Sequence, residues 1–185
     1  MRGLLMISSA SDLADCLAAN ARLRERVSAE VPVALHVASC RDPGRVPARG
    51  RPELALDLPA GTFIVGLALA HDSVLLPTPA ERLLNRNVRG LLRGLGAQYF
   101  GGEHLVVEGR PVAWVGFDRD AEQRVLIEAS VGVEAAIATW PISDMRGRAF
   151  ASLREAGFAG SAAELVERIV AGHARFGVEF EACES

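Results

Sequence analysis

Apolar residues recur at helical spacing in several parts of the chain, and the clearest example follows the segment Thr78-Pro79-Ala80-Glu81. Thr78 can cap a helix, Pro79 suits the first helical position, and Glu81 can complete a capping box. Gly96 suits the position just past the helix end. We therefore predict a helix from about Thr78 to Leu95 that packs on a sheet through one apolar face, formed by Leu83, Leu84, Val88, Leu91 and Leu92.

Three further segments have helix-like patterns. The first is expected to begin near Ser11 as its N-cap and to end before Pro32, with Leu13, Leu17, Leu23 and Val27 as its apolar positions. A second helix is expected over Asp144–Ala156. A third begins with the capping box Ser161-Ala162-Ala163-Glu164 and carries an apolar face made by Leu165, Val166, Ile169, Val170 and His173.

Extended segments lie between these helices. Thr62–Ala70 is a nearly continuous apolar run with Gly66 inside it, as expected for a buried strand. Leu105–Val107 and Val112–Phe117 flank the turn Glu108-Gly109-Arg110-Pro111, which predicts a hairpin. Further strands are expected at Val31–Val37 and Val125–Val133, whereas residues 39 to 53 are rich in Pro, Gly and Arg and are expected to form a loop.

The order of these elements is mixed rather than strictly alternating. We therefore predict an α+β fold in which helices flank a mixed, largely antiparallel sheet. The length of 185 residues suits one domain, and no composition shift divides the chain, so residues 1–185 are expected to form a single domain.

Composition narrows the function classes. Half of the residues are hydrophobic, and the formal net charge is -3 with a pI of about 5.8, which argues against nucleic-acid binding. The cysteines, Cys16, Cys40 and Cys183, have no metal-ligand spacing and are odd in number, so neither a disulfide framework nor a metal site is expected. No apolar run reaches the length of a membrane span, and a cytoplasmic protein without a cofactor is the expectation.

The chain contains no lysine, because its 20 basic residues are all arginines. One interpretation is a GC-rich genome, which also accounts for the many Arg, Ala, Gly and Leu residues. The other is selection against self-acylation of surface lysines. Both stay open on the sequence alone.

The segment Glu103–Phe117, E-H-L-V-V-E-G-R-P-V-A-W-V-G-F, resembles the central hairpin of the lipoate- and biotin-protein ligase family. In that family a strand ends in a Gly-Arg-Lys turn and the next strand runs Ile-Ala-Gly. The resemblance extends over Asp12–Val133, through an opening alanine-rich helix, a Pro-Ala-Gly-Thr turn before a buried strand, and a helix ending in Leu95-Gly96. It implies a ligase-like scaffold, in which the family's lysine grips an acyl-adenylate. Here that position corresponds to Pro111.

The sequence also departs from the family at its phosphate-binding loop. Family ligases carry an Arg-Arg-x-x-Gly-Gly-Gly-type loop, whose glycines let backbone N–H groups approach a phosphate. The corresponding stretch here is Arg49-Gly50-Arg51-Pro52-Glu53, where Pro52 lacks a donor and Glu53 adds negative charge. The cysteine that octanoyltransferases of this fold use is absent both from 98–100 and from 139–141.

The resemblance implies a remnant ligand site between the Arg49–Arg51 loop and the strand Val112–Gly116. Trp114 either packs in the core or enters the space that the family's ligand fills, and Arg110 could replace the missing ammonium. No catalytic residue can be assigned, since Cys40 lacks an identifiable base other than His36, whose direction is unknown. The candidate ligand-binding residues are Arg49, Gly50, Arg51, His104, Arg110, Trp114 and Gly116.

Three functions are compatible with these observations. The first is a divergent ligase-like protein without acyl-adenylating activity, which binds an acyl group, a carrier domain or a partner protein. The second is an active acyltransferase or ligase that uses Arg110, His104 or Cys40. The third is an unrelated α+β interaction protein with a chance resemblance. The oligomeric state is left open.

Overall fold

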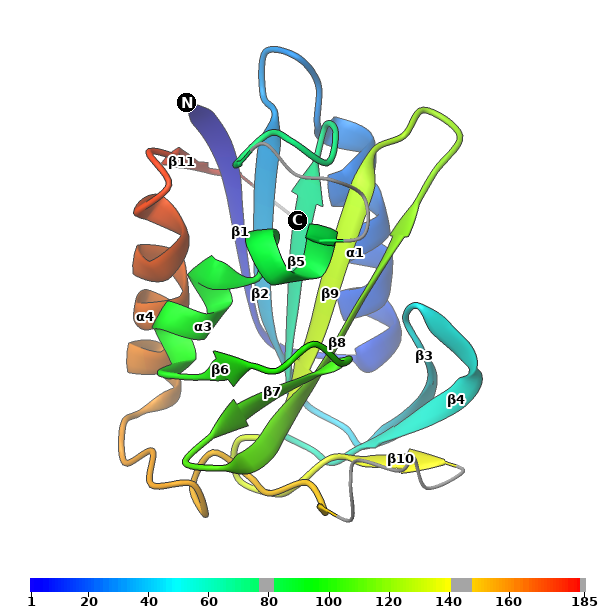
Figure 1. Cartoon of the computed structure of the whole chain (residues 1–185), viewed down its shortest axis with the longest axis vertical. Helices are drawn as coiled ribbons and strands as arrows, with labels where there is room; N and C mark the ends of the chain where they lie inside the picture. The colour runs from blue at the N-terminus through cyan, green and yellow to red at the C-terminus, as the bar shows by residue number, and fades with distance from the viewer. Residues whose placement is uncertain (77–81, 141–147, 184–185) are drawn as a thin grey trace.

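The computed structural model describes residues 1–76, 82–140 and 148–183, and in these residues two β-sheets and four helices form the fold (Figure 1). The large sheet has eight strands in the order β11-β1-β2-β5-β9-β8-β7-β6. Strand β1 runs parallel to both β11 and β2, and the other neighbours are antiparallel. Its strands are β1 (Arg2–Ser11), β2 (Val33–Cys40), β5 (Phe63–Leu69), β6 (Gln98–Tyr99), β7 (His104–Val107), β8 (Arg110–Arg119), β9 (Val125–Val131) and β11 (Glu179–Ala182).

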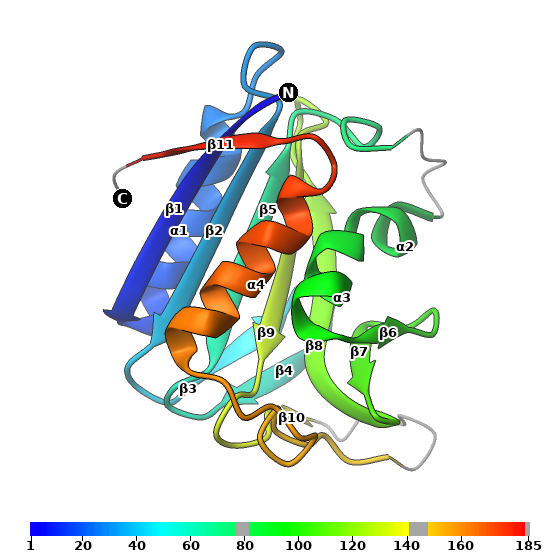
Figure 2. The ribbon, with the colours of Figure 1, turned by 90° about the vertical axis from the view of Figure 1, so that its left-hand side faces the viewer.

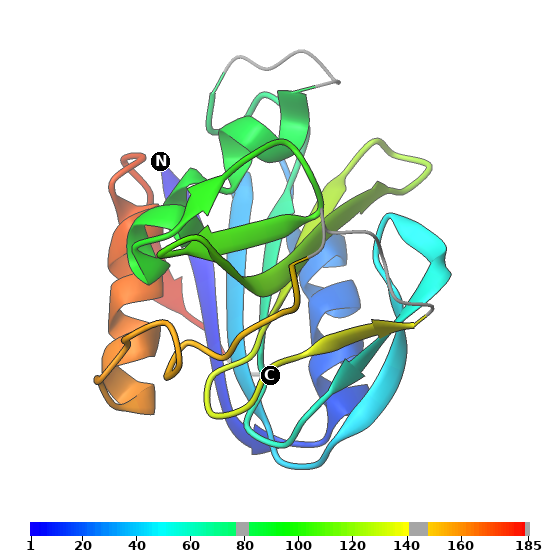
Figure 3. The ribbon, with the colours of Figure 1, turned by 60° about the horizontal axis from the view of Figure 1, so that its bottom comes forward.

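A second sheet of three antiparallel strands lies beside the large one (Figure 3). Its strand order is β10-β4-β3, with β3 spanning Gly44–Ala48, β4 Arg51–Leu58 and β10 Ala138–Trp140. The mixed, largely antiparallel α+β architecture expected from the sequence is therefore confirmed.

Helices cover both faces of the large sheet (Figure 2). Helix α1 (Leu13–Arg26) lies on one face, and α3 (Arg89–Leu95) with α4 (Ala162–Ala174) lies on the other. Strand alternation divides the core accordingly: Val33, Leu35 and Val37 of β2 join the cluster beneath α3 and α4, whereas Ala34 and Ala38 face the other way. None of the described helices is long and apolar enough to cross a membrane.

Glycines let α3 and α4 pack with their backbones in contact. A Cβ atom added at Gly94 would lie 2.7 Å from the Cα atom of Ile169, and one at Gly172 would lie 2.2 Å from the carbonyl oxygen of Gly90. Either distance is shorter than carbon atoms tolerate, so a side chain at these positions would force the two helices apart.

The best-marked sequence elements form as expected. Ser161 caps α4, and both hydrogen bonds of its capping box with Glu164 are present. The β7–β8 hairpin turns at Glu108 and Gly109, which both have positive φ angles, as a two-residue turn of this kind requires. Gly96 takes the left-handed conformation at the end of α3.

The predicted helix at Thr78–Leu95 is only partly correct. Its start lies outside the described residues, and the remainder is two short helices, α2 (Leu83–Asn87) and α3, that meet at Val88. The side-chain amide of Asn87 donates to the carbonyl oxygen of Leu83, a local bond that competes with regular helical pairing. On the predicted apolar face, Leu83, Val88 and Leu91 are buried, whereas Leu84 and Leu92 are half-buried against the same cluster.

Three other predictions were wrong. Residues 39 to 53 contain most of the β3–β4 hairpin, in which Pro47 is tolerated because β3 is an edge strand with a bulge beside that proline. The described part of the predicted helix Asp144–Ala156 begins at residue 148; it is irregular up to residue 152 and forms a turn from residue 153. Ser11 ends strand β1, so that the N-cap of α1 is Asp12.

Candidate functional site

A row of four paired residues crosses the centre of the large sheet on the face covered by α1. His36 of β2 pairs with Gly66 of β5, Gly66 with Glu128 of β9, and Glu128 with Gly116 of β8. The two glycines make room for other parts of the chain. A Cβ atom at Gly66 would lie 2.2 Å from the side-chain oxygen of Asn20, and one at Gly116 would lie 1.8 Å from the carbonyl oxygen of Arg49.

Asn20 of α1 links the two polar residues of this row across Gly66. Its Nδ2 donates to Glu128 Oε2 at 2.7 Å, and its Oδ1 lies 2.7 Å from His36 Nδ1. The Nδ1 atom must then carry a proton, which leaves Nε2 to accept from the Ser8 hydroxyl at 3.0 Å. Burial, with a smaller effect of Arg22, lowers the pKa of His36 to about 4, so the ring is neutral near pH 7.

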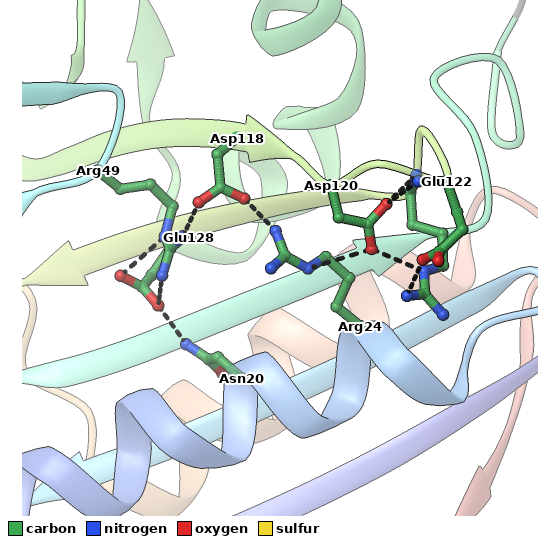
Figure 4. Close-up of polar contacts among 8 residues, drawn as sticks. Asn20, Arg24, Arg49, Asp118, Asp120, Glu122 and Glu128 are labelled. Carbon is green, nitrogen blue, oxygen red and sulfur yellow. Dashed lines mark hydrogen bonds and ion pairs between the residues drawn. The ribbon is translucent and has the colours of Figure 1, made fainter.

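Arg49 continues this network on the other side of Glu128 (Figure 4). Its Nη2 donates to Glu128 Oε2 at 3.2 Å, its Nη1 donates to Asp118, and its Nε lies 3.2 Å from Glu128 Oε1 without forming a hydrogen bond. Burial works to lower the pKa of Arg49, but Glu128 and Asp118 outweigh it and hold the pKa above its usual range. The guanidinium charge is thus compensated by carboxylates of the same chain.

The ion pairs extend from Asp118 along the surface of α1. Arg24 donates to Asp118 and lies 3.7 Å from Asp120, and Asp120 accepts from Arg124 at 2.7 Å (Figure 4). These contacts connect the helix, the end of β8 and the start of β9. Together with Arg49 they hold the loop before β4 against the large sheet.

Trp114 lies two residues before Gly116 on β8, and its side chain fills the space between the two sheets. Only 2% of it is exposed, and its indole N–H donates to the carbonyl oxygen of Arg49 at 3.4 Å. Trp114 is therefore buried, and it packs with Cys16, Ala38, Cys40, Ala48, Leu54, Leu56, Leu58, Ile64 and Ile137.

The Arg49–Arg51 loop and strand β8 meet as the sequence interpretation requires. Gly50 has a φ angle of 79° and packs on the backbone of Phe117. A Cβ atom added at Gly50 would lie 3.4 Å from the carbonyl oxygen of Phe117. Arg51 donates to Glu53 and, at 3.3 Å, to Glu103. Both arginines of the loop are therefore engaged with carboxylates of this chain.

Two further candidate ligand-binding residues, His104 and Arg110, lie on the β7–β8 hairpin. His104 is half-buried in β7 and pairs with Trp114 across the strands. Arg110 is exposed at the start of β8 and donates to the carbonyl oxygen of Glu155 at 3.1 Å. Arg110 precedes Gly116 by six residues, which corresponds to about 20 Å of extended strand, so the fold separates it from the Arg49 loop. Pro111, where the sequence resemblance places the family's lysine, is buried.

Sequence reasoning missed the polar residues that hold this site together, namely Asn20, Glu128, Asp118 and Arg24. A signal was present in β9, where Glu128 interrupts the apolar run V-L-I-E-A-S-V, and in β5, where Gly66 interrupts another. A charge in a fully buried strand requires a partner, but only the register shows that the partner is Asn20 above Gly66. Within the described residues, no cluster of three or more His, Cys, Asp or Glu side chains could hold a metal ion.

Comparison with known proteins shows similarity in structure but not in sequence. No family model and no curated protein matches the chain. A bi-partite lipoate protein ligase from Thermoplasma acidophilum superposes with a TM-score of 0.73 at 10% identity, covering 100% of this chain and 88% of that one. Lipoate-protein ligase A bound with ATP gives a TM-score of 0.72 at 10% identity, covering 100% and 89%.

Biotin protein ligases share the same fold at lower similarity. The enzyme from Leishmania major in complex with biotin gives a TM-score of 0.57 at 11% identity, covering 91% of this chain and 72% of that one. The likeness is thus not confined to the hairpin, because the fold of the whole chain is shared with these ligases. This chain has the fold of the lipoate- and biotin-protein ligases, in a divergent form that carries Pro111 in the hairpin where the sequence resemblance places a lysine.

Proposed function

We propose that this chain uses the ligase fold as a binding or assembly module and does not synthesise an acyl-adenylate. The observation that carries the proposal is Trp114, whose indole fills the space between the two sheets and bonds to the backbone of Arg49. An acyl chain bound between the Arg49 loop and β8 would have to displace this side chain. Displacing a buried tryptophan from its packing costs several kcal/mol, on the order of 3–5.

The charges around this position also argue against adenylate chemistry. Negative charge that develops on a phosphate needs positioned donors, and loss of one such donor typically slows a reaction by about a hundredfold or more. Pro111 has neither an ammonium nor an N–H group, and Arg49 and Arg51 already pair with Glu128, Asp118, Glu53 and Glu103. A phosphate would therefore compete with four carboxylates for two guanidinium groups.

A carrier domain or partner subunit is the ligand class that we favour. The solved structures of similar fold include a ligase described together with its E2 lipoyl domain and a ligase with bound lipoic acid. A protein that keeps the scaffold while a side chain fills the space between its sheets can still present an outer surface to a protein partner. A buried small-molecule ligand has less support, because Trp114 and its neighbours fill the space between the two sheets.

The test is ATP–pyrophosphate exchange in the presence of lipoate, octanoate or biotin, with an active lipoate ligase as the positive control. We expect no exchange above background with any of the three acids. Exchange that depends on one of them would show that the adenylating activity survives and would refute the proposal. Native mass spectrometry of the purified protein provides a second measurement: a co-purified protein supports the proposal, whereas a covalently bound acyl group contradicts it.

The alternative of an active acyltransferase gains little from the geometry. Its three candidate residues do not converge: Arg110 lies at the far end of β8 from the Arg49 loop, and His104 lies across from Trp114. Cys40 is 1% exposed, and its pKa is raised by its hydrogen bond to Cys16 and by burial. A thiol held in the protonated form is a poor nucleophile.

A further inference from the structure

Two of the three cysteines face each other beneath the first turn of α1. Cys16 belongs to the helix and Cys40 is the last residue of β2, and each is 1% exposed. The Cys40 thiol donates a hydrogen bond to Cys16 Sγ with a sulfur–sulfur distance of 3.7 Å. Both are free thiols, as is Cys183 near the other end of the chain.

The backbone around this pair is already tied together. Ser11 pairs with Cys40 between β1 and β2, Arg41 N donates to the carbonyl oxygen of Ser11 at 2.9 Å, and Cys16 N donates to that of Asp12 at 3.0 Å. A disulfide requires a sulfur–sulfur distance of about 2.05 Å, so the sulfurs must approach by less than about 2 Å. The hydrogen bonds between the flanking backbone segments already hold the two cysteines side by side, so the approach is asked of the side chains.

The surroundings of the pair distinguish its two thiols. Cys16 borders a hollow of about 210 Å³ between β1 and α1, which is also lined by Ser8, Ser11, Asp15, Ala19 and Arg22. The hydrogen bond from Cys40 holds the pKa of Cys16 below its ordinary value, although burial and the carboxylates of Asp15 and Asp12 act in the opposite direction. The same hydrogen bond raises the pKa of Cys40. Cys16 is therefore the thiol that a small oxidant from the hollow meets first.

We propose that Cys16 and Cys40 are a redox-active dithiol, which a hydroperoxide converts into an intramolecular disulfide by way of Cys16. The Cys16 sulfur attacks the peroxide, the O–O bond breaks, and the sulfenic acid of Cys16 forms with release of one water molecule (an alcohol from an organic hydroperoxide). Oxidation of Cys16 removes the acceptor of the hydrogen bond that holds the Cys40 proton, and the Cys40 sulfur then attacks Cys16 Sγ and displaces the hydroxyl group, which leaves as water with the Cys40 proton. Two electrons pass from the thiols to one peroxide, and the S–S bond replaces two S–H bonds.

The disulfide would join α1 to β2 at the edge of the apolar cluster that contains Trp114. The joined residues are 24 positions apart in the chain. Closing a loop of this length restricts the unfolded chain, which should raise the midpoint of thermal unfolding by about 5–10 °C in a protein of this size. Oxidation would thus stabilise the fold where α1 packs on β2.

The test uses Cys183→Ser, which keeps both thiols of the pair, treated with a small excess of hydrogen peroxide and then alkylated in denaturant. We expect a monomer whose mass is lower by two hydrogens and in which neither thiol of the pair can be alkylated. The peptide map should contain a Cys16–Cys40 disulfide, and the melting temperature should be higher. Dithiothreitol should reverse all of these changes. Two thiols that stay alkylatable after treatment, or a disulfide only between molecules, would overturn the proposal.

The order of the two steps is tested with single variants in the Cys183→Ser background. Cys40→Ser should stop at the sulfenic acid of Cys16, which dimedone traps, whereas Cys16→Ser should leave Cys40 reduced under the same conditions. Dimedone labelling of Cys40 in Cys16→Ser, with none of Cys16 in Cys40→Ser, would contradict the assignment of Cys16 as the first thiol. The peptide map of Cys183→Ser stays decisive for the disulfide itself if either single variant fails to fold.

Discussion

At the scale of one residue, Pro111 stands in the hairpin where the sequence resemblance places the family's lysine. The proline is buried in β8, and its carbonyl oxygen accepts a hydrogen bond from Ala151 N at 2.8 Å. Sequence resemblance was sufficient to find this position, because the flanking Gly109 and Val112 keep the pattern of the family hairpin. The contacts of Arg49 could not be found in that way, since its partners lie 69 and 79 residues further along the chain.

Replacing Pro111 with lysine alone should not create ligase activity. The variant regains an ammonium, but Arg49 and Arg51 still pair with carboxylates, and Trp114 still fills the space between the sheets. ATP–pyrophosphate exchange with lipoate should therefore stay at background. Exchange in Pro111→Lys but not in the wild type would show that the lysine was the only missing group.

Replacing Trp114 with alanine should open a cavity between the sheets and destabilise the fold by about 3–5 kcal/mol. If the cavity lies where an acyl chain would fit, the variant should bind octanoate, measurable by calorimetry, while the wild type shows no heat of binding. Trp140→Ala is the matched control, because Trp140 is 59% exposed on β10 and its removal leaves no internal space. A variant that folds but binds octanoate no better than the control would show that this space is not a remnant acyl site.

At the scale of elements, local signals were reliable where they did not depend on distant partners. The capping box of α4 and the positive-φ turn of the β7–β8 hairpin are complete within a few residues, and both form as expected. Strand β1 was missed because its serine-rich end lacks alternation, and it is a strand through pairing with β2 and β11. The β3–β4 hairpin was read as a loop for the same reason, since its strands are held by each other and by β10.

The split of the predicted helix into α2 and α3 changes which leucine matters most. Leu83 is 1% exposed, whereas Leu84 is half-buried at the margin of the same cluster. Leu83→Ala should cost about 2–5 kcal/mol of unfolding free energy, and Leu84→Ala should cost less than half as much. Urea unfolding of the two variants checks this, and equal losses would contradict the deeper burial of Leu83.

At the scale of the whole molecule, two buried histidines should make stability depend on pH. Burial lowers the pKa of His36 and of His173 to about 4, from an ordinary value near 6.5. Between these values the unfolded chain binds protons that the folded chain does not, so stability is complete above about pH 6.5 and falls as the pH drops toward 4. Each histidine should account for a loss of about 2–3 kcal/mol between pH 7 and 4.5.

Urea unfolding at these two pH values measures the effect. His36→Gln and His173→Gln should each reduce the difference between the two unfolding free energies, even if they lower both. His71→Gln, at an exposed position, is the matched control and should keep the wild-type difference. A pH dependence that is unchanged in both buried-site variants would show that the histidines are not the source.

The sequence by itself determined the α+β class, the likeness of the hairpin to that of the ligase family and the absence of lysine from it, because each depends on residues that are neighbours in the chain. The tertiary structure decided that Trp114 is core, that Arg49 is paired, and that Cys16 and Cys40 meet. These facts depend on the register of β2, β5, β9 and β8, which places Asn20 over Gly66 and the Arg49 backbone over Gly116. Local propensity carries no information about contacts between residues so far apart, since only the packing of helix and sheets brings them together.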